Sequence, residues 1–424
     1  MISIGGVTMC VRVIGMLKEM VIAGFFGVGV AVDAYMLAML LPGIALTSVV
    51  HSLPTAMMPA YVQERSGAGP EAASSLYTNV TSLAIPLLIG TCLFIYIVGP
   101  VIVTSVADDF PTEALNLIKS LLYCVAPIVI IAGWRLLLAS LLNAEERFAL
   151  VAVTPVLTSS AIIILVLTFA KIFGIYTVAI GVVVGAILEL IVLVALCRRL
   201  QLHILPKWDG LSPKLRQIIK EFGPLAFGSL LLTSNVIIDQ AMAAMLGPGN
   251  VSALGFGNRI TEVLVGLGTA ALATAIFPYF STMVAKRQWE QIRHTLATYA
   301  RLLAYVTVPI TIILLVFSNE IISLLFERGE FSNEDTQLVG AVQFYYALQI
   351  PFHVIAMLAV RLISALQMNR ILMWGTVISL VLNVTLNLVF MELIGVAGIA
   401  LSTACVILVS FTYLWTMVYR VLPR

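Results

Sequence analysis

The sequence predicts an all-α integral membrane protein. Hydrophobic residues make up 61% of the 424 residues and charged residues only 10%, whereas a soluble domain carries roughly 25% charged residues. The apolar runs are long and continuous rather than alternating, as between Ala161 and Leu196. Because backbone polar groups in hydrocarbon must be satisfied internally, and the apolar runs do not alternate, a bundle of helices is favoured over a closed barrel.

About twelve segments are long and apolar enough to cross a bilayer, which takes about 20 residues. We expect them at 3–26, 34–61, 78–104, 115–141, 148–171, 174–197, 221–246, 251–284, 295–317, 336–366, 370–391 and 393–419. Several contain proline, including Pro42, Pro54 and Pro59. We therefore expect tilted or kinked helices with space between them.

Basic residues set the predicted orientation. The connection over 198–220 holds six Lys and Arg residues, whereas the connections over 107–113 and 326–335 are acidic. By the positive-inside rule both termini face the cytoplasm, and we expect a multi-pass protein of the bacterial cytoplasmic (inner) membrane. The net charge of +2 is too small to indicate binding of nucleic acid.

The sequence resembles itself across its two halves. The segment "FFGVGVAVDA" at 25–34 resembles "MLGPGNVSAL" at 245–254, and "FGIYTVAIG" at 173–181 resembles "IGVAGIALS" at 394–402. An even number of helices in each half makes this a parallel repeat, and transporters of that kind hold substrate between the repeats and alternate access by rocking.

We therefore predict two pseudo-symmetric six-helix lobes around a central cavity. The divisions are an N-terminal lobe at 1–200, a basic cytoplasmic linker at 201–220 and a C-terminal lobe at 221–424.

Three charges lie within eight positions of the first predicted span: Arg12, Lys18 and Glu19. An ionisable group at the bilayer centre costs about 2.5–3.5 kcal/mol, so such residues face the bundle interior. Arg12 and Glu19 are two turns apart and share a face, where they could form a structural pair. Lys18 points about 100° away and has no equally obvious local partner, which indicates a wet cavity of positive potential.

Further ionisable residues lie in the second and eighth spans. Asp33 opens the second span, where an acid also suits the helix dipole. Arg259 and Glu262 are three apart and can pair locally. Lys and Arg from both halves, meeting across a central cleft, would suit a pyrophosphate, because they offer fixed positive charge and several donors. The predicted substrate-binding residues are Arg12, Lys18, Glu19, Asp33, Arg259 and Glu262, with no catalytic residue.

Asp239 is the deepest isolated acid. Asn383 and Asn387 lie at i,i+4 on one face of the eleventh span, and Thr403 lies in the twelfth. Oxygen ligands around one carboxylate suit a hard monovalent cation such as Na⁺. The alternative is that the asparagines only join helices by hydrogen bonds, and the residues alone favour that alternative.

Three stretches resemble the MurJ/MviN lipid II flippases of the multidrug/oligosaccharidyl-lipid/polysaccharide (MOP) exporter superfamily. They are "RVIGMLKEMVIAGFFGVGVAVDAYMLAMLLP", "LGPGNVSALGFGNRITEVLVGLGTAALATAIFP" and "LLFERGEFSNEDTQLVGAVQFYYALQIP". The last carries the LFxRGxF signature and is the most specific. The resemblance covers nearly the whole chain. It implies two six-helix lobes in a V, enclosing a cationic cavity for the pyrophosphate-sugar head group of a polyprenyl lipid.

The resemblance also implies roles for residues. Arg12, Lys18, Glu19, Asp33 and Arg259 match functional positions of the family's cavity. A sodium site described in some members matches Asp239, Asn383, Asn387 and Thr403, with Asn387 where an acid may stand. With twelve predicted spans, we do not expect the lipid-tail groove that two further C-terminal helices form in that family.

One departure concerns the stretch after "LLPG". The family has a basic pair and then an acid there, whereas this sequence reads "IALTSVVHS", with His51 near the place of the acid. A less charged cavity weakens lipid II as the substrate and favours another undecaprenyl-linked glycan, such as an exopolysaccharide repeat unit.

The predicted function is therefore a flippase rather than an enzyme. It would move an undecaprenyl-pyrophosphate-linked glycan, lipid II or an exopolysaccharide unit, from the inner to the outer leaflet by alternating access. We expect a monomer without a cofactor and with Na⁺ as a candidate coupling ion. The alternatives are a MATE-like cation/drug antiporter, whose cavity would be acidic, and a membrane glycosyltransferase or polymerase, which would need a soluble domain or a large acidic loop.

Overall fold

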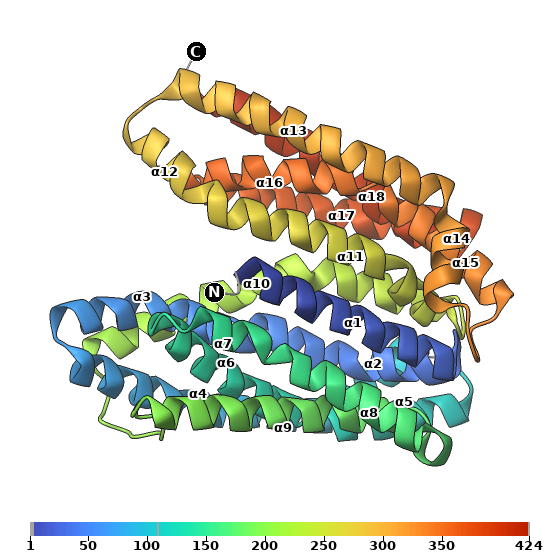
Figure 1. Ribbon diagram of the computed structural model, residues 1–424, viewed down its shortest axis with the longest axis horizontal. Coiled ribbons are helices and arrows are strands. Elements are labelled where there is room, and N and C mark those ends of the chain that lie inside the picture. Colours follow the sequence, from blue (N-terminus) through green and yellow to red (C-terminus); the bar gives the residue numbers. More distant parts are fainter. Residues whose placement is uncertain (1–3, 108–109, 423–424) are drawn as a thin grey trace. The chain divides into compact units, whose positions relative to one another are not determined.

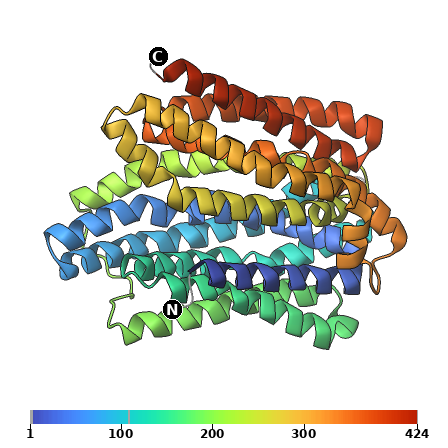
Figure 2. The same cartoon turned by 45° about the horizontal axis from the view of Figure 1, so that its top comes forward.

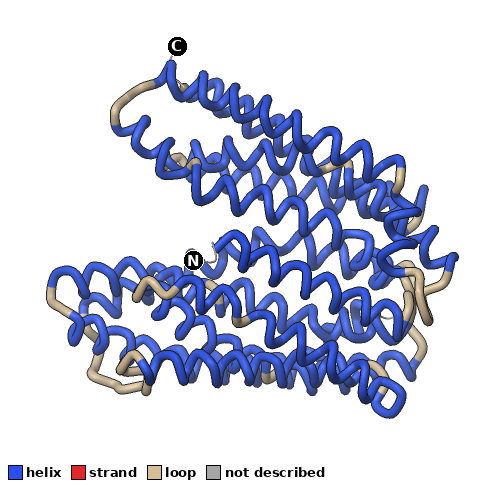
Figure 3. Tube along the Cα trace, viewed as in Figure 1, coloured by secondary structure: helices blue, strands red, loops and turns tan. Residues whose placement is uncertain are grey.

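The computed structural model describes residues 4–107 and 110–422, and the regular elements in these ranges are all helices (Figure 3). In chain order they are α1 (Ile4–Phe26), α2 (Val30–Ala45), the π-helix η1 (Leu46–Val50), α3 (Ser52–Gly67), α4 (Pro70–Val106), α5 (Thr112–Val125), α6 (Ile128–Ala144), α7 (Phe148–Val153), α8 (Pro155–Phe173), α9 (Tyr176–Arg199), α10 (Pro213–Met245), α11 (Asn250–Ala275), α12 (Phe277–Ala285), α13 (Trp289–Val316), α14 (Ser318–Phe326), α15 (Asn333–Ala347), α16 (Ile350–Ala365), α17 (Asn369–Ile394) and α18 (Val396–Val421).

The chain forms two compact units, Met1–Thr233 and Ser234–Arg424. Within each unit the long helices run side by side (Figures 1 and 2). The boundary falls inside α10, after the basic connection that precedes this helix. The division into lobes at 1–200 and 221–424, with a linker between them, stays a prediction.

Ten helical segments of the described residues are long and apolar enough to cross a membrane, and they lie where the sequence predicts ten of the twelve spans. The other two predicted spans, 3–26 and 251–284, coincide with α1 and with α11 plus α12. α1 is not among the ten because three charges lie in its apolar stretch. The protein is therefore an all-α, multi-pass membrane protein, as the sequence predicts.

The helix pairs of the two units correspond. α8 packs on α9 in the first unit as α17 packs on α18 in the second, and α2 packs on α5 as α11 packs on α15. The backbone agrees at the turns: Gly174 and Gly395 follow α8 and α17 with φ of 54° and 62°. These positions are 221 residues apart, and the same spacing separates Glu146 from Gln367, which also have positive φ. The structure thus contains the internal repeat.

The second span leaves regular α-helical geometry at η1. There the backbone N–H of His51 donates to the carbonyl of Leu46, five residues earlier, at 3.0 Å. Pro54 has no N–H with which to reach the carbonyl of Val50, so the α-helical ladder is interrupted at this point in any case. This π turn lies just before Pro54, in the stretch that departs from the family pattern.

The LFxRGxF signature forms a compact turn between α14 and α15. Phe326 and Phe331 are buried and pack on Phe256 of α11, with ring centroids 5.4 and 5.9 Å from that ring. Arg328 donates to the carbonyl of Leu324 at 3.0 Å and so caps the end of α14. Gly329 has φ of 59°, where a side chain would be strained. The signature therefore stabilises the fold of the second unit.

Candidate functional site

α1 places a buried acid next to a cation. Nζ of Lys18 lies 2.8 Å from Oε1 of Glu19, so the prediction that Lys18 lacks a local partner is wrong. Successive residues of a helix point about 100° apart, but the flexible four-carbon stem of Lys18 lets the ammonium turn back to its neighbour. Glu19 is only 6% exposed. The pair keeps the acid compensated inside a largely apolar helix.

Arg12 lies two turns before Glu19 on α1 and is partly buried. Its Nε is shielded from solvent and has no hydrogen-bond partner among the described residues. Leaving a buried donor without an acceptor is unfavourable. This N–H is therefore free to meet an acceptor on a ligand.

Asp33 is completely buried in the first turn of α2. The helix follows Gly29, which has no side chain with which to cap it, and the N–H of Asp33 donates to the Gly29 carbonyl at 3.0 Å. Its carboxyl group thus lies at the positive end of the helix dipole, the structural alternative that the sequence raised. That position accounts for an acid here without a ligand.

Arg259 and Glu262 pair along α11, as the sequence predicts. NH1 of Arg259 lies 3.0 Å from Oε2 of Glu262, and Asn258 donates to Oε1 of the same carboxylate at 3.1 Å. The side chain of Glu262 is half exposed. Arg12, Lys18, Glu19 and Asp33 belong to the first unit, whereas Arg259 and Glu262 belong to the second. Their convergence on one cavity stays a prediction.

The four residues predicted around a cation do come together in the second unit. Oδ1 of Asp239, on α10, accepts from the amides of Asn383 at 2.9 Å and Asn387 at 2.7 Å, both on α17. Oδ2 accepts from the hydroxyl of Thr403 on α18 at 3.1 Å. Asp239, Asn383 and Asn387 are buried. In this arrangement the amides act as donors and join three helices, as in the alternative interpretation.

The same four side chains also fit a cation. Oδ1 of Asn387 is buried and has no hydrogen-bond partner among the described residues. With the Asp239 carboxylate and the Thr403 hydroxyl beside it, the set offers oxygen ligands and one negative charge, which suits a hard cation. Within the described residues no group of three or more His, Cys, Asp or Glu could hold a metal. The donor set therefore favours a monovalent ion over zinc.

The internal repeat shows that the fold does not require this polar cluster. At a spacing of 221 residues, Asn383, Asn387 and Thr403 correspond to three apolar residues of α8 and α9 in the first unit. All three are buried in helix contacts: Ile162, Val166 and Val182. Apolar packing holds the equivalent helices of the first unit together, so the polar set around Asp239 is a feature of the second unit alone among the described residues of the two.

A buried ion pair in the first unit joins two residues that the sequence analysis did not pair, Arg135 of α6 and Glu189 of α9. Nη1 of Arg135 lies 2.8 Å from Oε2 of Glu189, which is 3% exposed, and Thr158 of α8 donates to the other carboxylate oxygen. Gly185 permits the contact, because a Cβ there would lie 2.4 Å from Cα of Thr158. The sequence signal that could have revealed this pair is an opposite charge at a similar depth on another membrane helix.

The comparisons with known proteins agree on one family. Residues 22–423 match the family model described as "Lipid II flippase MurJ". A probable lipid II flippase MurJ of Buchnera aphidicola is 23% identical, over 99% of this chain and 83% of that protein. One of Rhizobium meliloti is 25% identical, over 94% of this chain and 76% of that protein.

Solved structures show the same fold. A lipid II flippase MurJ in an inward closed conformation superposes with a TM-score of 0.86 at 21% identity, covering 99% of this chain and 88% of that one. An inward-facing MATE family multidrug resistance transporter of the MOP superfamily gives 0.80 at 13% identity, covering 98% of both chains. Because the family model spans nearly the whole sequence, this chain belongs to the lipid II flippase MurJ family.

Proposed function

We propose that this protein flips a polyprenyl-pyrophosphate-linked glycan from the inner to the outer leaflet by alternating access. The observation that carries the proposal is family membership over residues 22–423, combined with cations placed on two membrane helices, α1 and α11. Lipid II, which the family name specifies, is the first candidate substrate. The family is one of transporters, and we propose no catalytic residue.

The cations would bind the pyrophosphate. Arg12 has a buried N–H without an acceptor among the described residues, and Lys18 and Arg259 each contact a carboxylate. Hydrogen bonds from these groups to phosphate oxygens are charge-assisted and therefore strong. Glu19 and Glu262 then serve as the counter-ions of the empty carrier, so that an incoming anion competes with them and an outgoing anion is replaced by them.

The Asp239 cluster would hold the coupling ion. Asp239, Asn383, Asn387 and Thr403 supply only oxygen ligands to Na⁺, and the bound ion supplies a positive charge that neutralises the buried carboxylate. Each charge that crosses the field is worth about 2.3 kcal/mol per 100 mV. Occupancy of the cluster could therefore bias the conformation of the second unit.

An exopolysaccharide repeat unit is the second candidate substrate. In the segment 43–52 the hydroxyls of Thr47 and Ser48 donate to backbone carbonyls of Gly43 and Ile44, at 3.0 and 2.6 Å. They thus occupy a stretch where the family resemblance implies charged residues. A glycan with less negative charge than lipid II would need fewer cations there.

The membrane, the orientation and the oligomeric state are part of the same proposal. We place the protein in the bacterial cytoplasmic membrane with both termini inside, because the connection before α10 is basic. We propose that it works as a monomer and binds no nucleic acid. The drug antiporter alternative rests on a shared fold at 13% identity, and an antiporter for cations would need acids where this chain has Arg12 and Arg259.

Flipping can be tested with purified protein in liposomes that contain fluorescent lipid II or a fluorescent undecaprenyl-linked repeat unit. Exposure of the head group is read by quenching from outside. We expect the protein to expose the head group of one of these lipids and to transport no cationic dye. Transport of the dye without lipid flipping would replace the proposal with the antiporter.

A further inference from the structure

A cavity of about 920 Å³ opens at the basic end of the first unit. It lies where α3, α4, α6 and α9 meet the connection over 200–212. The cavity is lined by the apolar side chains of Leu141, Leu202 and Ile204 and by the aromatic side chains of Tyr61 and Tyr77. The predicted transport residues line no part of it, so the function proposed above does not explain it.

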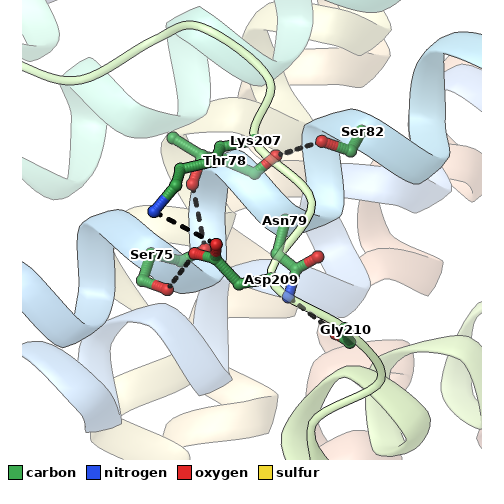
Figure 4. Close-up of polar contacts among 7 residues, drawn as sticks. All are labelled: Ser75, Thr78, Asn79, Ser82, Lys207, Asp209 and Gly210. Atoms are coloured by element: carbon green, nitrogen blue, oxygen red, sulfur yellow. Dashed lines mark hydrogen bonds and ion pairs between the residues drawn. The ribbon is translucent and has the colours of Figure 1, made fainter.

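The connection that closes this cavity is fastened to α4 (Figure 4). Asn79 donates to the carbonyl of Gly210 at 2.9 Å, and Ser75 donates to Oδ2 of Asp209 at 3.2 Å. Nζ of Lys207 lies 3.1 Å from Oδ1 of the same aspartate. These contacts hold the connection as a wall of the cavity, and they compensate the charges of Lys207 and Asp209 within it.

Tyr77 carries a buried hydroxyl whose hydrogen bonding is incomplete. Its side chain is fully buried and belongs to the lining of the cavity. The side chain of Thr81, one turn further along α4, interacts with the hydroxyl and donates to the backbone carbonyl of Tyr77 at 2.8 Å, but no hydrogen bond of regular geometry reaches the hydroxyl from the described residues. Buried hydroxyls are almost always paired. This hydroxyl therefore has a hydrogen-bonding position left for a ligand.

Three exposed residues that line the cavity, of both signs, form no ion pair with a described residue. Arg198 and His203 form no ion pair in the described part of the chain, and neither does Glu71 in the first turn of α4. Glu145, in contrast, is compensated by Arg65 at 2.6 Å. A ligand that fits must thus offer an anionic group, a cationic group and apolar stems for the remaining walls.

The cavity also lies at the depth of lipid head groups. It sits at the ends of membrane helices, and the adjacent connection exposes Trp208 and Leu205, at 52% and 68%. Tryptophan beside basic residues is typical of the membrane–water interface. Phospholipids are therefore the amphiphilic ligands available at this depth.

We propose that this cavity binds the head group of a zwitterionic phospholipid of the phosphatidylethanolamine class. Arg198 and His203 contact the phosphate, and Glu71 contacts the ammonium. The hydroxyl of Tyr77 donates to a phosphate or ester oxygen. Bound lipid then fixes the connection against the first unit at the start of α10.

The test uses the full chain, purified in detergent and stripped of lipid, and titrated with short-chain phosphatidylethanolamine. Binding is read by native mass spectrometry and by the rise in Tm. We expect saturable binding that Arg198→Gln weakens about tenfold, since a charge-assisted bond is lost. Arg199→Gln is the matched control, because Arg199 is the next residue and is exposed like Arg198, but does not line the cavity.

Tyr77→Phe separates a binding role from a structural one. Removing a hydroxyl that makes no regular hydrogen bond among the described residues should leave the Tm of the lipid-free protein nearly unchanged, while lipid binding weakens severalfold. Glu71→Gln should shift the preference from phosphatidylethanolamine toward phosphatidylglycerol, since the ammonium loses its carboxylate.

Three results would overturn the proposal. One is equal binding by the Arg198→Gln and Arg199→Gln proteins. Another is a Tyr77→Phe protein that binds lipid as the wild type does. The third is equal stabilisation by soluble phosphoethanolamine, which would assign the cavity to a free phosphate compound instead of a lipid.

Discussion

The amide of Asn387 donates to Asp239 across 2.7 Å while its own oxygen stays buried without a hydrogen-bond partner in the described part of the chain. The carboxylate is thus surrounded by donors, and an acceptor beside it is unused. If the amide turned about its last torsion, it would present that oxygen to the same space. The cluster therefore has two ways to compensate the buried charge: amide donors without an ion, and oxygen ligands with one.

Asp239→Asn should abolish the dependence of stability on Na⁺. Without the carboxylate no negative charge compensates the ion, and the remaining neutral oxygens bind Na⁺ weakly. The measurement is the Tm in detergent with NaCl or with choline chloride at equal ionic strength. Thr385→Ala, at an exposed position of α17, should keep the wild-type response. A Na⁺ effect that survives Asp239→Asn would place the ion elsewhere.

Asn387→Asp should have opposite effects with and without Na⁺. Two carboxylates in hydrogen-bond contact repel each other, so the ion-free protein should lose stability. With Na⁺ the second charge should tighten binding by about tenfold or more, since like charges sharing one cation are both compensated. Titrations of Tm against NaCl will show both effects. A uniform loss of stability at every Na⁺ concentration would mean that the asparagine only joins helices.

Much of the fold could be predicted, because span length and continuous apolarity follow directly from the bilayer as solvent. The repeat was visible in short glycine-containing segments, and the turn at Gly174 and Gly395 is the same in both units. The set around Asp239 was also found, because a lone acid needs polar partners on neighbouring spans. Its donors and acceptors could not be assigned, since sequence does not say which way an amide turns.

Side-chain pairing was the weakest part of the prediction. Lys18 reaches its own neighbour, and Arg135 reaches Glu189, because long side chains choose partners by local packing rather than by helical phase. The cavity behind the connection before α10 was missed as well. Tyr77, which lines this cavity, could not be distinguished in the sequence from the other hydrophobic residues of a membrane helix.

Glu189→Gln should strongly destabilise the first unit. The change leaves Arg135 without its carboxylate in a largely buried place, and breaking a buried pair costs about 3–5 kcal/mol. Thermal unfolding in detergent should show the loss. Arg65→Gln breaks the more exposed pair with Glu145 and should cost at most about 1 kcal/mol. If both changes lower the Tm equally, burial does not set the strength of the Arg135–Glu189 pair.

Arg259→Ala should nearly abolish flipping while insertion and folding are kept. A charged hydrogen bond to the pyrophosphate is worth about 1.5–3 kcal/mol, or about 10–100-fold in head-group affinity. The assay is head-group exposure in liposomes, with Tm as the check on folding. Glu262→Gln is the companion variant: it removes the carboxylate that pairs with Arg259 along α11 and should tighten head-group binding. Wild-type flipping by Arg259→Ala would remove this residue from the site.

Glu327, at the end of α14, should make the second unit sensitive to acid. Hydrogen bonds from Ser323 and Thr336 hold the pKa of its carboxyl below the ordinary value of 4.5. A lowered pKa means that the stabilisation is complete above pH 4.5 and is lost as the pH falls through the folded-state pKa. Glu327→Gln should therefore flatten the fall in stability below pH 4.5.

Hydrogen exchange of the amides in 326–336 measures this effect locally. Because the intrinsic rate of amide exchange slows as the pH falls, the comparison uses protection factors: those of the wild type should fall below pH 4.5, and Glu327→Gln should remove that fall. Glu330→Gln is the matched control, because Glu330 lies in the same turn but makes no hydrogen bond in the described part of the chain. An unchanged acid response in Glu327→Gln, or an equal change in Glu330→Gln, would show that the hydrogen bonds of Glu327 do not set the stability of this turn.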